Sequence, residues 1–256
     1  TSGQIRFRGK DWLKLNKKAL RTERKHFQMI FQDPFSSLDP RMAIGQIIKE
    51  PFKVHGIGSN AEQNQWTGEL LEKVGLKPIH AKRYPHEFSG GQRQRLAIAR
   101  TIALKPQLVI ADEPVSALDV SIQAQILNLM QDLQDELGLT YLFISHDLAV
   151  VEHLCDHIAV MYLGRIVDIA PRDKLFSRKA HPYTRALIQA IPEVGKGRKK
   201  DKVSLQGEVP SPLNPPAGCH FHPRCIQATE ICRNETPPLR NLSNDSQHQS
   251  ACWLNS

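Results

Sequence analysis

The 256-residue sequence contains no apolar run near the roughly 18 uninterrupted residues that a membrane-spanning helix requires. It starts without a methionine and without the charged-then-apolar pattern of a secretory signal peptide. We therefore expect a protein that is cytoplasmic or peripherally attached to the cytoplasmic side of a membrane. Hydrophobic residues make up 40% of the chain and charged residues 23%, which is ordinary for a globular domain.

A second absence is the phosphate-binding motif Gly-x-x-x-x-Gly-Lys-Ser/Thr. The pairs Gly9-Lys10 and Gly195-Lys196 are followed by neither Ser nor Thr. The 256 residues therefore contain no phosphate cradle of this type. Pairs of the form Cys-x-x-Cys, which are typical of structural zinc sites, are also missing.

The charge is unbalanced, with 34 basic and 26 acidic residues and a net charge of +8. Such an excess suits either nucleic acid or the anionic face of a membrane. Most basic residues are scattered, and the one dense cluster lies in a glycine-containing linker, at Lys196, Arg198, Lys199, Lys200 and Lys202. We therefore expect no nucleic-acid partner, although this charge keeps that alternative open.

The most informative stretch runs from Phe88 to Asp119. Its first half, Ser89-Gly90-Gly91-Gln92, is a small-residue turn that opens a helix, and a helix N-terminus favours bound anions such as phosphate. Its second half is the apolar run 108–111, which ends in two adjacent carboxylates, Asp112 and Glu113. A buried strand that ends in carboxylates predicts a site for a metal ion and water in an α/β nucleotide-binding fold.

Together with Ser116-Ala-Leu-Asp119, these motifs resemble those of the ATP-binding subunits of ABC transporters. The resemblance implies an α/β fold with a RecA-like ATPase core, formed by residues 1–40 and 101–192. It also implies a helical subdomain at 41–100, where Ile44, Ile47, Ile48 and Phe52 share one face. Residues 193–256 would form a linker and a cysteine-rich region.

The resemblance also implies roles for individual residues in ATP hydrolysis. Gln32, at the end of the strand predicted at 27–32, would contact Mg²⁺ and the attacking water. Asp112 would hold Mg²⁺ through water, Glu113 would act as general base, and His146 would contact the γ-phosphate. Asp119 and Ser89, Gly90, Gly91 and Gln92 would contact ATP or the opposing subunit.

Members of this family carry the phosphate-binding motif upstream of a segment similar to residues 1–7. We therefore expect that the sequence starts downstream of it, and that this chain alone does not bind ATP tightly. A degenerate subunit is the alternative, but intact Gln32, Asp112, Glu113 and His146 favour truncation. The chain would supply the signature half of an ATP site in a second, homologous ATPase subunit.

The stretches 84–95, 181–192 and 207–219 resemble the peptide-importer branch, specifically the F-type member of the paired oligopeptide and dipeptide ATPases. This implies two transmembrane permease subunits, a periplasmic or lipid-anchored peptide-binding protein, and a location on the cytoplasmic face of the inner membrane. Nickel or another small solute is an alternative substrate within the branch. The alternative function is a soluble ABC ATPase that acts on nucleic acid or ribosomes.

Four of the five cysteines, Cys219, Cys225, Cys232 and Cys252, lie in the tail. Stable disulfides are not expected in a cytosolic protein, whereas four thiolates can ligate a [4Fe–4S] cluster without a fixed short spacing. Cluster-binding tails are also associated with peptide-importer ATPases. Zinc is the alternative, because His220 and His222 could replace two thiolates. The fifth cysteine, Cys155, is predicted to be a small buried core residue.

Overall fold

The computed structural model describes residues 3–33, 37–178, 180–191, 207–243 and 245–255. The chain divides into two compact units, Thr1–His146 and Asp147–Ser256. The boundary between these units, at residues 146 and 147, lies inside the stretch 101–192 that is predicted as ATPase core. The domain boundaries given above therefore stay a prediction. Within the described ranges, the helices are all too short or too polar to cross a membrane.

The first unit begins with a small hairpin and two short helices. Strands β1 (Arg6–Phe7) and β2 (Lys10–Asp11) pair antiparallel. Gly9 permits this reversal because its φ of 73° lies in the left-handed region. The chain continues through helix α1 (Lys17–Glu23), which is flanked by 3₁₀ turns at Trp12–Lys14 and Arg24–His26.

Three parallel strands form the centre of this unit, in the order β3, β4, β5. Strand β3 (Phe27–Ile30) pairs with β4 (Leu108–Asp112), and β4 pairs with β5 (Thr140–Ile144). The strand predicted at 27–32 is thus confirmed, although it ends two residues earlier. Because the strands are parallel, the residues that follow them lie at the same edge of the sheet.

The segment between β3 and β4 is helical, as predicted. Helix α3 (Ile44–His55) buries the predicted face of Ile44, Ile47, Ile48 and Phe52, and α4 (Asn60–Lys73) begins with a Ser59–Glu62 capping box. Two 3₁₀ turns, Pro78–Lys82 and Pro85–Glu87, lead into helix α5 (Gly90–Ile102).

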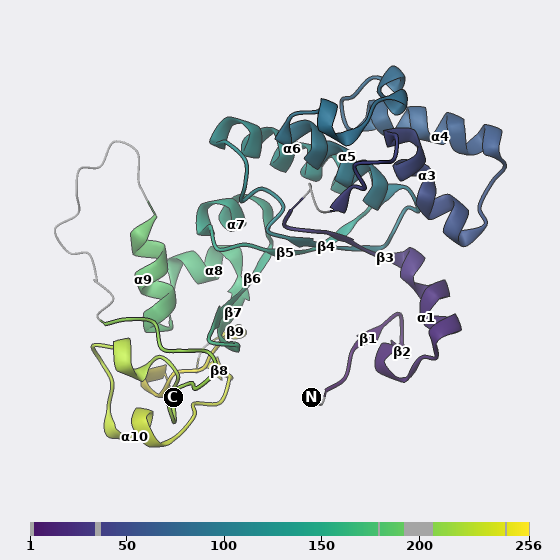
Figure 1. Ribbon diagram of the computed structural model, residues 1–256. Coiled ribbons are helices and arrows are strands. Elements are labelled where there is room, and N and C mark those ends of the chain that lie inside the picture. The colour runs from purple at the N-terminus through teal and green to yellow at the C-terminus, as the bar shows by residue number, and fades with distance from the viewer. Residues whose placement is uncertain (1–2, 34–36, 179, 192–206, 244, 256) are drawn as a thin grey trace. The chain divides into compact units, whose positions relative to one another are not determined.

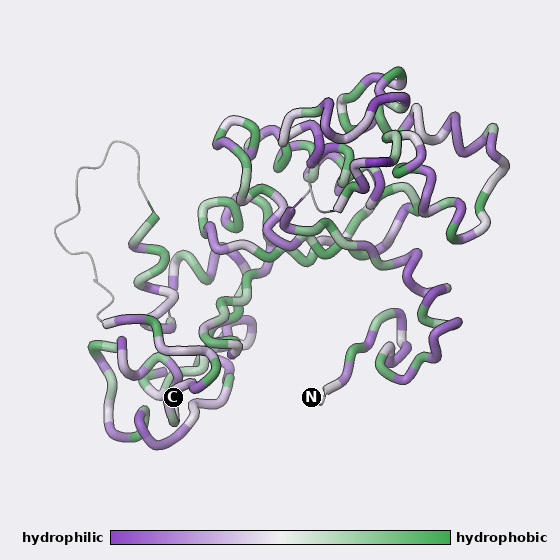
Figure 2. Tube along the Cα trace, in the orientation of Figure 1, coloured by the Kyte–Doolittle hydropathy of each residue, from purple (hydrophilic) through white to green (hydrophobic). Residues whose placement is uncertain are grey.

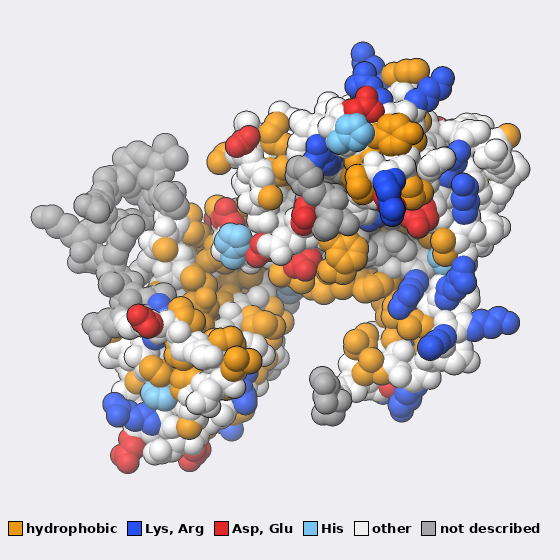
Figure 3. Space-filling model, viewed as in Figure 1, with side chains coloured by type: hydrophobic (Ala, Val, Ile, Leu, Met, Phe, Trp, Pro, Cys, Tyr) orange, Lys and Arg blue, Asp and Glu red, His pale blue; other side chains and the backbone are white. Residues whose placement is uncertain are grey.

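Helices α5 and α6 (Val120–Leu137) cover one side of the parallel sheet (Figure 1). On α6, the side chains of Ile126, Met130 and Leu133 share one face and are buried. Leu142 and Ile144 of β5, in contrast, are 52% and 45% exposed. The strands are largely hydrophobic (Figure 2), and hydrophobic side chains are visible along the sheet in Figure 3. Parallel sheets are usually covered on both faces, so this exposure is unusual.

The second unit starts with helix α7 (Leu148–Leu154) and an antiparallel hairpin of β6 (His157–Tyr162) and β7 (Arg165–Pro171). Gly164 lies at the turn of this hairpin, at a φ of 77° that favours glycine. Helices α8 (Arg172–Ser177) and α9 (Pro182–Ala190) follow. The tail contains a 3₁₀ turn at His222–Arg224, helix α10 (Glu230–Asn234), strands β8 (Arg240–Leu242) and β9 (Asp245–Ser250), and a last turn at Trp253–Asn255.

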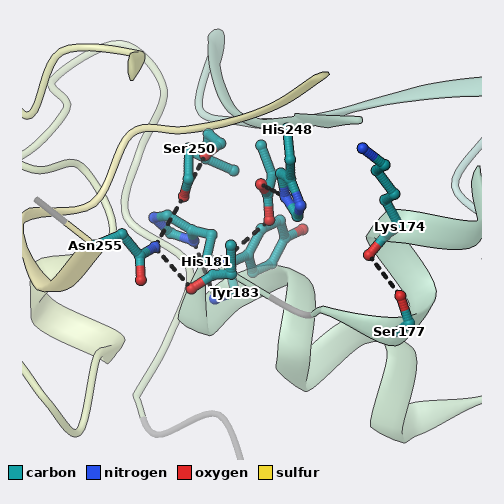
Figure 4. A network of polar contacts seen from close by, with 10 residues as sticks. Lys174, Ser177, His181, Tyr183, His248, Ser250 and Asn255 are labelled. Atoms are coloured by element: carbon teal, nitrogen blue, oxygen red, sulfur yellow. Dashed lines mark hydrogen bonds and ion pairs between the residues drawn. The ribbon is translucent and has the colours of Figure 1, made fainter. Parts of the chain in front are cut away.

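Strand β9 pairs with β7, so the sheet has the order β6-β7-β9-β8. The cysteine-rich tail is therefore part of this sheet, which the sequence does not predict. A buried polar network supports the pairing (Figure 4): Nε2 of His248 donates to Oδ1 of Asp168 over 2.7 Å. The backbone N–H of His181 donates to Oδ2 of Asp168 over 3.0 Å. Asp168 and His248 are fully buried, so this carboxylate depends on both donors.

Candidate active site

The structure brings Gln32, Glu113 and His146 together at the carboxyl edge of the parallel sheet. Nε2 of Gln32 donates to Oε2 of Glu113 over 2.8 Å, and Nδ1 of His146 lies 2.9 Å from Oε1 of Glu113. An ionised carboxylate can only accept, so this contact requires a hydrogen on Nδ1 of His146. The three residues follow three neighbouring strands, and the parallel topology explains why residues so distant in sequence meet.

Glu113 is held in an unusual backbone conformation, with a φ of 44°. Its N–H donates to the carbonyl of Ile144 on β5 over 2.9 Å, and the hydroxyl of Ser116 donates to its carbonyl over 3.1 Å. A positive φ is costly for a side chain of this size and is tolerated where the surroundings fix it. The sequence analysis does not predict the contact from Ser116. Its only signal in the sequence is the spacing of three residues between Glu113 and Ser116, which is typical of a turn.

The electrostatics keep Glu113 ionised. The hydrogen bond from His146 is the largest cause that lowers the pKa of Glu113 below its usual value, and Ser116 and Gln32 act in the same direction. Partial burial opposes them. A carboxylate of low pKa, fixed at both oxygens, can orient a water molecule and stabilise positive charge on it. Asp112 precedes it as the last residue of β4.

The predicted signature residues form the start of helix α5. Ser89 is the N-cap: its hydroxyl accepts from the N–H of Gln92, and the Gln92 side chain accepts from the N–H of Ser89. Gln92 therefore caps the helix in this structure, whereas the resemblance implies that it contacts ATP. The first N–H groups of a helix have no partner within it, and together with the helix dipole they favour a phosphate group.

Gly91 is required for packing at this helix start. A Cβ atom on Gly91 would lie 2.5 Å from Cγ2 of Ile122 on α6, whereas one on Gly90 would lie 3.6 Å from Cδ2 of Leu118. The two glycines thus differ in their surroundings. Asp119, which is predicted to face an opposing subunit, is the N-cap of α6, although its side chain does not make the capping hydrogen bond.

The four tail cysteines line one small cavity of the second unit, together with His181, Phe221 and His222. Burial raises the pKa of the Cys219, Cys225 and Cys252 thiols, in the last case to about 11. Nevertheless, in the described part of the chain the arrangement of His, Cys, Asp and Glu side chains does not form a ready metal site. Cys155 is half-buried rather than fully buried as predicted, and burial raises the pKa of its thiol as well.

Some predicted features lie outside the described residues. They are the basic cluster at Lys196, Arg198, Lys199, Lys200 and Lys202, and Pro192, the last residue of the stretch 181–192.

A parallel sheet with Gln32, Glu113 and His146 at one edge, combined with a glycine-opened helix, defines an ABC-type ATPase. The family model described as "ABC transporter" matches residues 1–116, and the model "Oligopeptide/dipeptide transporter, C-terminal region" matches residues 167–232. The chain belongs to the family of ATP-binding proteins of ABC-type peptide importers, and its activity is ATP hydrolysis coupled to peptide uptake.

Its relatives include a probable peptide ABC transporter ATP-binding protein, y4tS, of Sinorhizobium fredii, which is 58% identical over 93% of this chain and 68% of that protein. The oligopeptide transport ATP-binding protein AppF of Bacillus subtilis is 52% identical over 99% of this chain and 78% of its own length. The dipeptide transport ATP-binding protein DppF of Haemophilus influenzae is 50% identical, with 93% and 73% covered.

Solved structures support the same fold. The ATP-binding cassette MJ0796, in a dimeric post-hydrolysis state with ADP and Pi, is similar with a TM-score of 0.59 and 28% identity. This match covers 67% of this chain and 74% of MJ0796. The protein cbiO1 of Clostridium perfringens, part of the transporter complex cbiONQ, has a TM-score of 0.62 and 27% identity, with 70% of each chain covered.

Proposed function

We propose that Glu113 is the general base that polarises water for attack on the γ-phosphate of ATP. The observation that carries this proposal is the convergence of Gln32 and His146 on its carboxylate, at 2.8 and 2.9 Å. Phosphoryl transfer depends mainly on positioning and charge neutralisation, which these contacts supply. Asp112, at the same strand end, would hold Mg²⁺ through water, and His146 would turn to the γ-phosphate when ATP is bound.

The phosphate-binding loop of this half-site would come from a segment that the 256 residues do not contain. The exposed Leu142 and Ile144 support this, because they would be covered if a further segment packed on that face of the sheet. Ser89, Gly90 and Gly91 would close over ATP held by a homologous second ATPase subunit. The dimeric state of the similar MJ0796 structure is consistent with such an arrangement.

The remaining partners are two permease subunits and a peptide-binding protein, and the chain would be a peripheral subunit on the cytoplasmic face of the inner membrane. The substrate is an oligopeptide or a dipeptide, since relatives of both kinds are similar. The alternative of a soluble ATPase on nucleic acid would predict salt-sensitive DNA or RNA binding. Co-purification with membrane subunits would contradict it.

The test is ATP hydrolysis by the complete importer in proteoliposomes, with and without peptide-loaded binding protein. Glu113→Gln should lower the rate by about 10³-fold while the complex still assembles, because the amide keeps the shape of the side chain and loses its basicity. Glu152→Gln, on helix α7, is the matched control and should leave the rate unchanged. A Glu113→Gln importer that hydrolyses ATP at the normal rate would contradict the assignment.

We further propose that Cys219, Cys225, Cys232 and Cys252 ligate a [4Fe–4S] cluster, with zinc as the alternative. Their convergence on one cavity supports this, because four thiols are a donor set that can hold either group. The raised thiol pKa values mean that the metal would have to displace the protons. The cluster would stabilise the tail rather than take part in ATP hydrolysis.

An anaerobic absorption spectrum with iron, sulfide and zinc analysis distinguishes these outcomes. About four irons and four sulfides per chain, lost in Cys225→Ser, are expected for the cluster. Cys155→Ser, which changes the cysteine outside the tail, should retain them. One zinc per chain without iron would establish the zinc site instead. A protein that contains neither iron nor zinc would overturn both the cluster and the zinc site.

A further inference from the structure

Arg100 is a partly buried cation near the end of helix α5, which begins at the signature glycines. Burial lowers the pKa of its guanidinium, and the carboxylate of Glu50 on α3 opposes that shift. A guanidinium taken out of water requires hydrogen-bond acceptors to offset the lost hydration. Its Nη1 donates to the backbone carbonyl of Ser37.

Ser37 belongs to the segment that follows Gln32 on its way to helix α3. Residues 38–42 of it make local contacts: Leu38 is 1% exposed, and the carboxylate of Asp39 accepts from the N–H of Arg41 over 2.9 Å. The carbonyl of Asp39 accepts from the N–H of Met42 over 3.1 Å. The hydrogen bond from Arg100 joins this stretch to α5, and its donor is a charged group.

Two other arginines of α5 provide a comparison. Nε of Arg93 donates to the carbonyl of Pro85, and Nη1 of Arg95 donates to the carbonyl of Val74, each over 2.8 Å. Both acceptors belong to the helical segment between α3 and α5. Arg100 differs from them because its acceptor lies five residues beyond Gln32.

Helix α5 is also fixed to strand β3, which leads into Gln32. The hydroxyl of Thr101 is buried, and it lies 3.4 Å from the carbonyl of Met29 on β3. Arg100 and Thr101 thus contact the chain on both sides of Gln32. At its other end the same helix carries Gly90 and Gly91. These contacts give a displacement of the segment after Gln32 a physical connection to the helix that carries the signature glycines.

We propose that Arg100 is a positioning residue that ties the segment after Gln32 to the signature helix, and so sets how Gln32 reaches Glu113. The inference rests on the proposed function, in which Gln32 assists hydrolysis in response to the membrane partner. Arg100 does not touch the reacting atoms. It acts through the placement of the Ser37 backbone.

The test compares peptide-stimulated ATP hydrolysis by the complete importer carrying Arg100→Gln with that carrying Arg95→Gln, the matched control. Arg100→Gln should lower kcat about tenfold and leave KM for ATP within about twofold, whereas Arg95→Gln should change neither by more than about twofold. Arg100→Lys keeps the charge and one donor, and it should recover about half of the lost rate.

A double-mutant cycle with Gln32→Ala separates positioning from mere folding. If Arg100 acts through Gln32, Arg100→Gln and Arg100→Lys should each lower kcat by less than about twofold in the Gln32→Ala background. Losses that multiply, or an equal loss in Arg95→Gln, would overturn the inference. If Arg100→Gln fails to assemble, the Arg100→Lys cycle gives the same decision. A wild-type importer without peptide-stimulated hydrolysis would instead refute the proposed function.

Discussion

Nδ1 of His146 lies 2.9 Å from Oε1 of Glu113, although 33 positions of sequence separate them. The His146 side chain is 73% exposed, whereas the Glu113 side chain is 24% exposed. The histidine can therefore move away without disturbing a core, while the carboxylate stays where its backbone holds it. In this structure the proposed base, Glu113, is hydrogen-bonded to His146 and Gln32.

This contact predicts the protonation behaviour of Glu113. His146→Ala removes the largest cause of its lowered pKa, so the pKa of Glu113 should rise towards its ordinary value. Any stability that Glu113 contributes is present above its unfolded pKa and is lost as the pH falls through its folded pKa. In the variant the folded and unfolded pKa values of Glu113 lie closer together, so this pH-dependent contribution should become smaller. Carboxyl ¹³C shifts of labelled glutamate, followed against pH, measure this.

Gln32→Ala is the comparison, because the hydrogen bond from Gln32 lowers the pKa of Glu113 less than the one from His146 does. Its loss should therefore shift that pKa less. Equal titration curves in wild type and His146→Ala would show that the two side chains are not in contact in solution.

The glycines of the signature predict a difference between two small substitutions. Gly91→Ala places a Cβ atom 2.5 Å from Ile122, and should destabilise the protein by about 1–3 kcal/mol through overpacking. Gly90→Ala meets an ordinary contact and should be neutral or slightly stabilising within the helix. Urea unfolding curves of both variants decide this. Equal stabilities would mean that α5 and α6 separate easily at this point.

The sequence alone could predict much of the carboxyl edge of the parallel sheet. Buried strands that end in Gln32, Glu113 and His146 predict their own convergence, because parallel strands end together. The left-handed φ of Glu113 was not predictable, because Glu rarely adopts it and the cause is the hydrogen bond to Ile144 on another strand. The link from Arg100 to Ser37 was not predictable for a similar reason, since it joins residues 63 positions apart.

The structure of the tail likewise could not be predicted from the sequence. Strand β9 consists mainly of polar residues, so no apolar alternation marks it as a strand. Its place beside β7 is supported by a buried hydrogen bond that only the fold reveals, between Asp168 and His248. The common cavity of the four cysteines likewise depends on chain reversals around Gly218, where φ is 64°.

The buried network predicts a large loss of stability in Asp168→Ala. The change removes the acceptor of His248 and of the His181 N–H, and leaves these buried donors unpaired, at a cost of about 1–3 kcal/mol each. Asp173→Ala is the control, because that carboxylate is exposed and its contact with Arg172 contributes little. Urea unfolding followed by the fluorescence of Trp253 measures both. A loss in Asp168→Ala as small as in the control would contradict the role of the network.

The last prediction concerns the pH dependence of the second unit. His181 is 1% exposed, and burial lowers its pKa to about 4. Its Nδ1 accepts from the N–H of Tyr183 at the start of α9, so the neutral ring is the form that caps the helix. Because the unfolded chain binds a proton at about pH 6.5 and the folded chain does not, stability should fall as the pH drops from 6.5 to 4, by about 3 kcal/mol. His181→Asn keeps a capping oxygen and has no titrating ring. Unfolding experiments that follow Trp253 from pH 7 to pH 4.5 measure this. The variant should lose less stability than the wild type. Identical slopes of the free energy of unfolding against pH would show that the buried ring binds a proton as readily as in the unfolded chain.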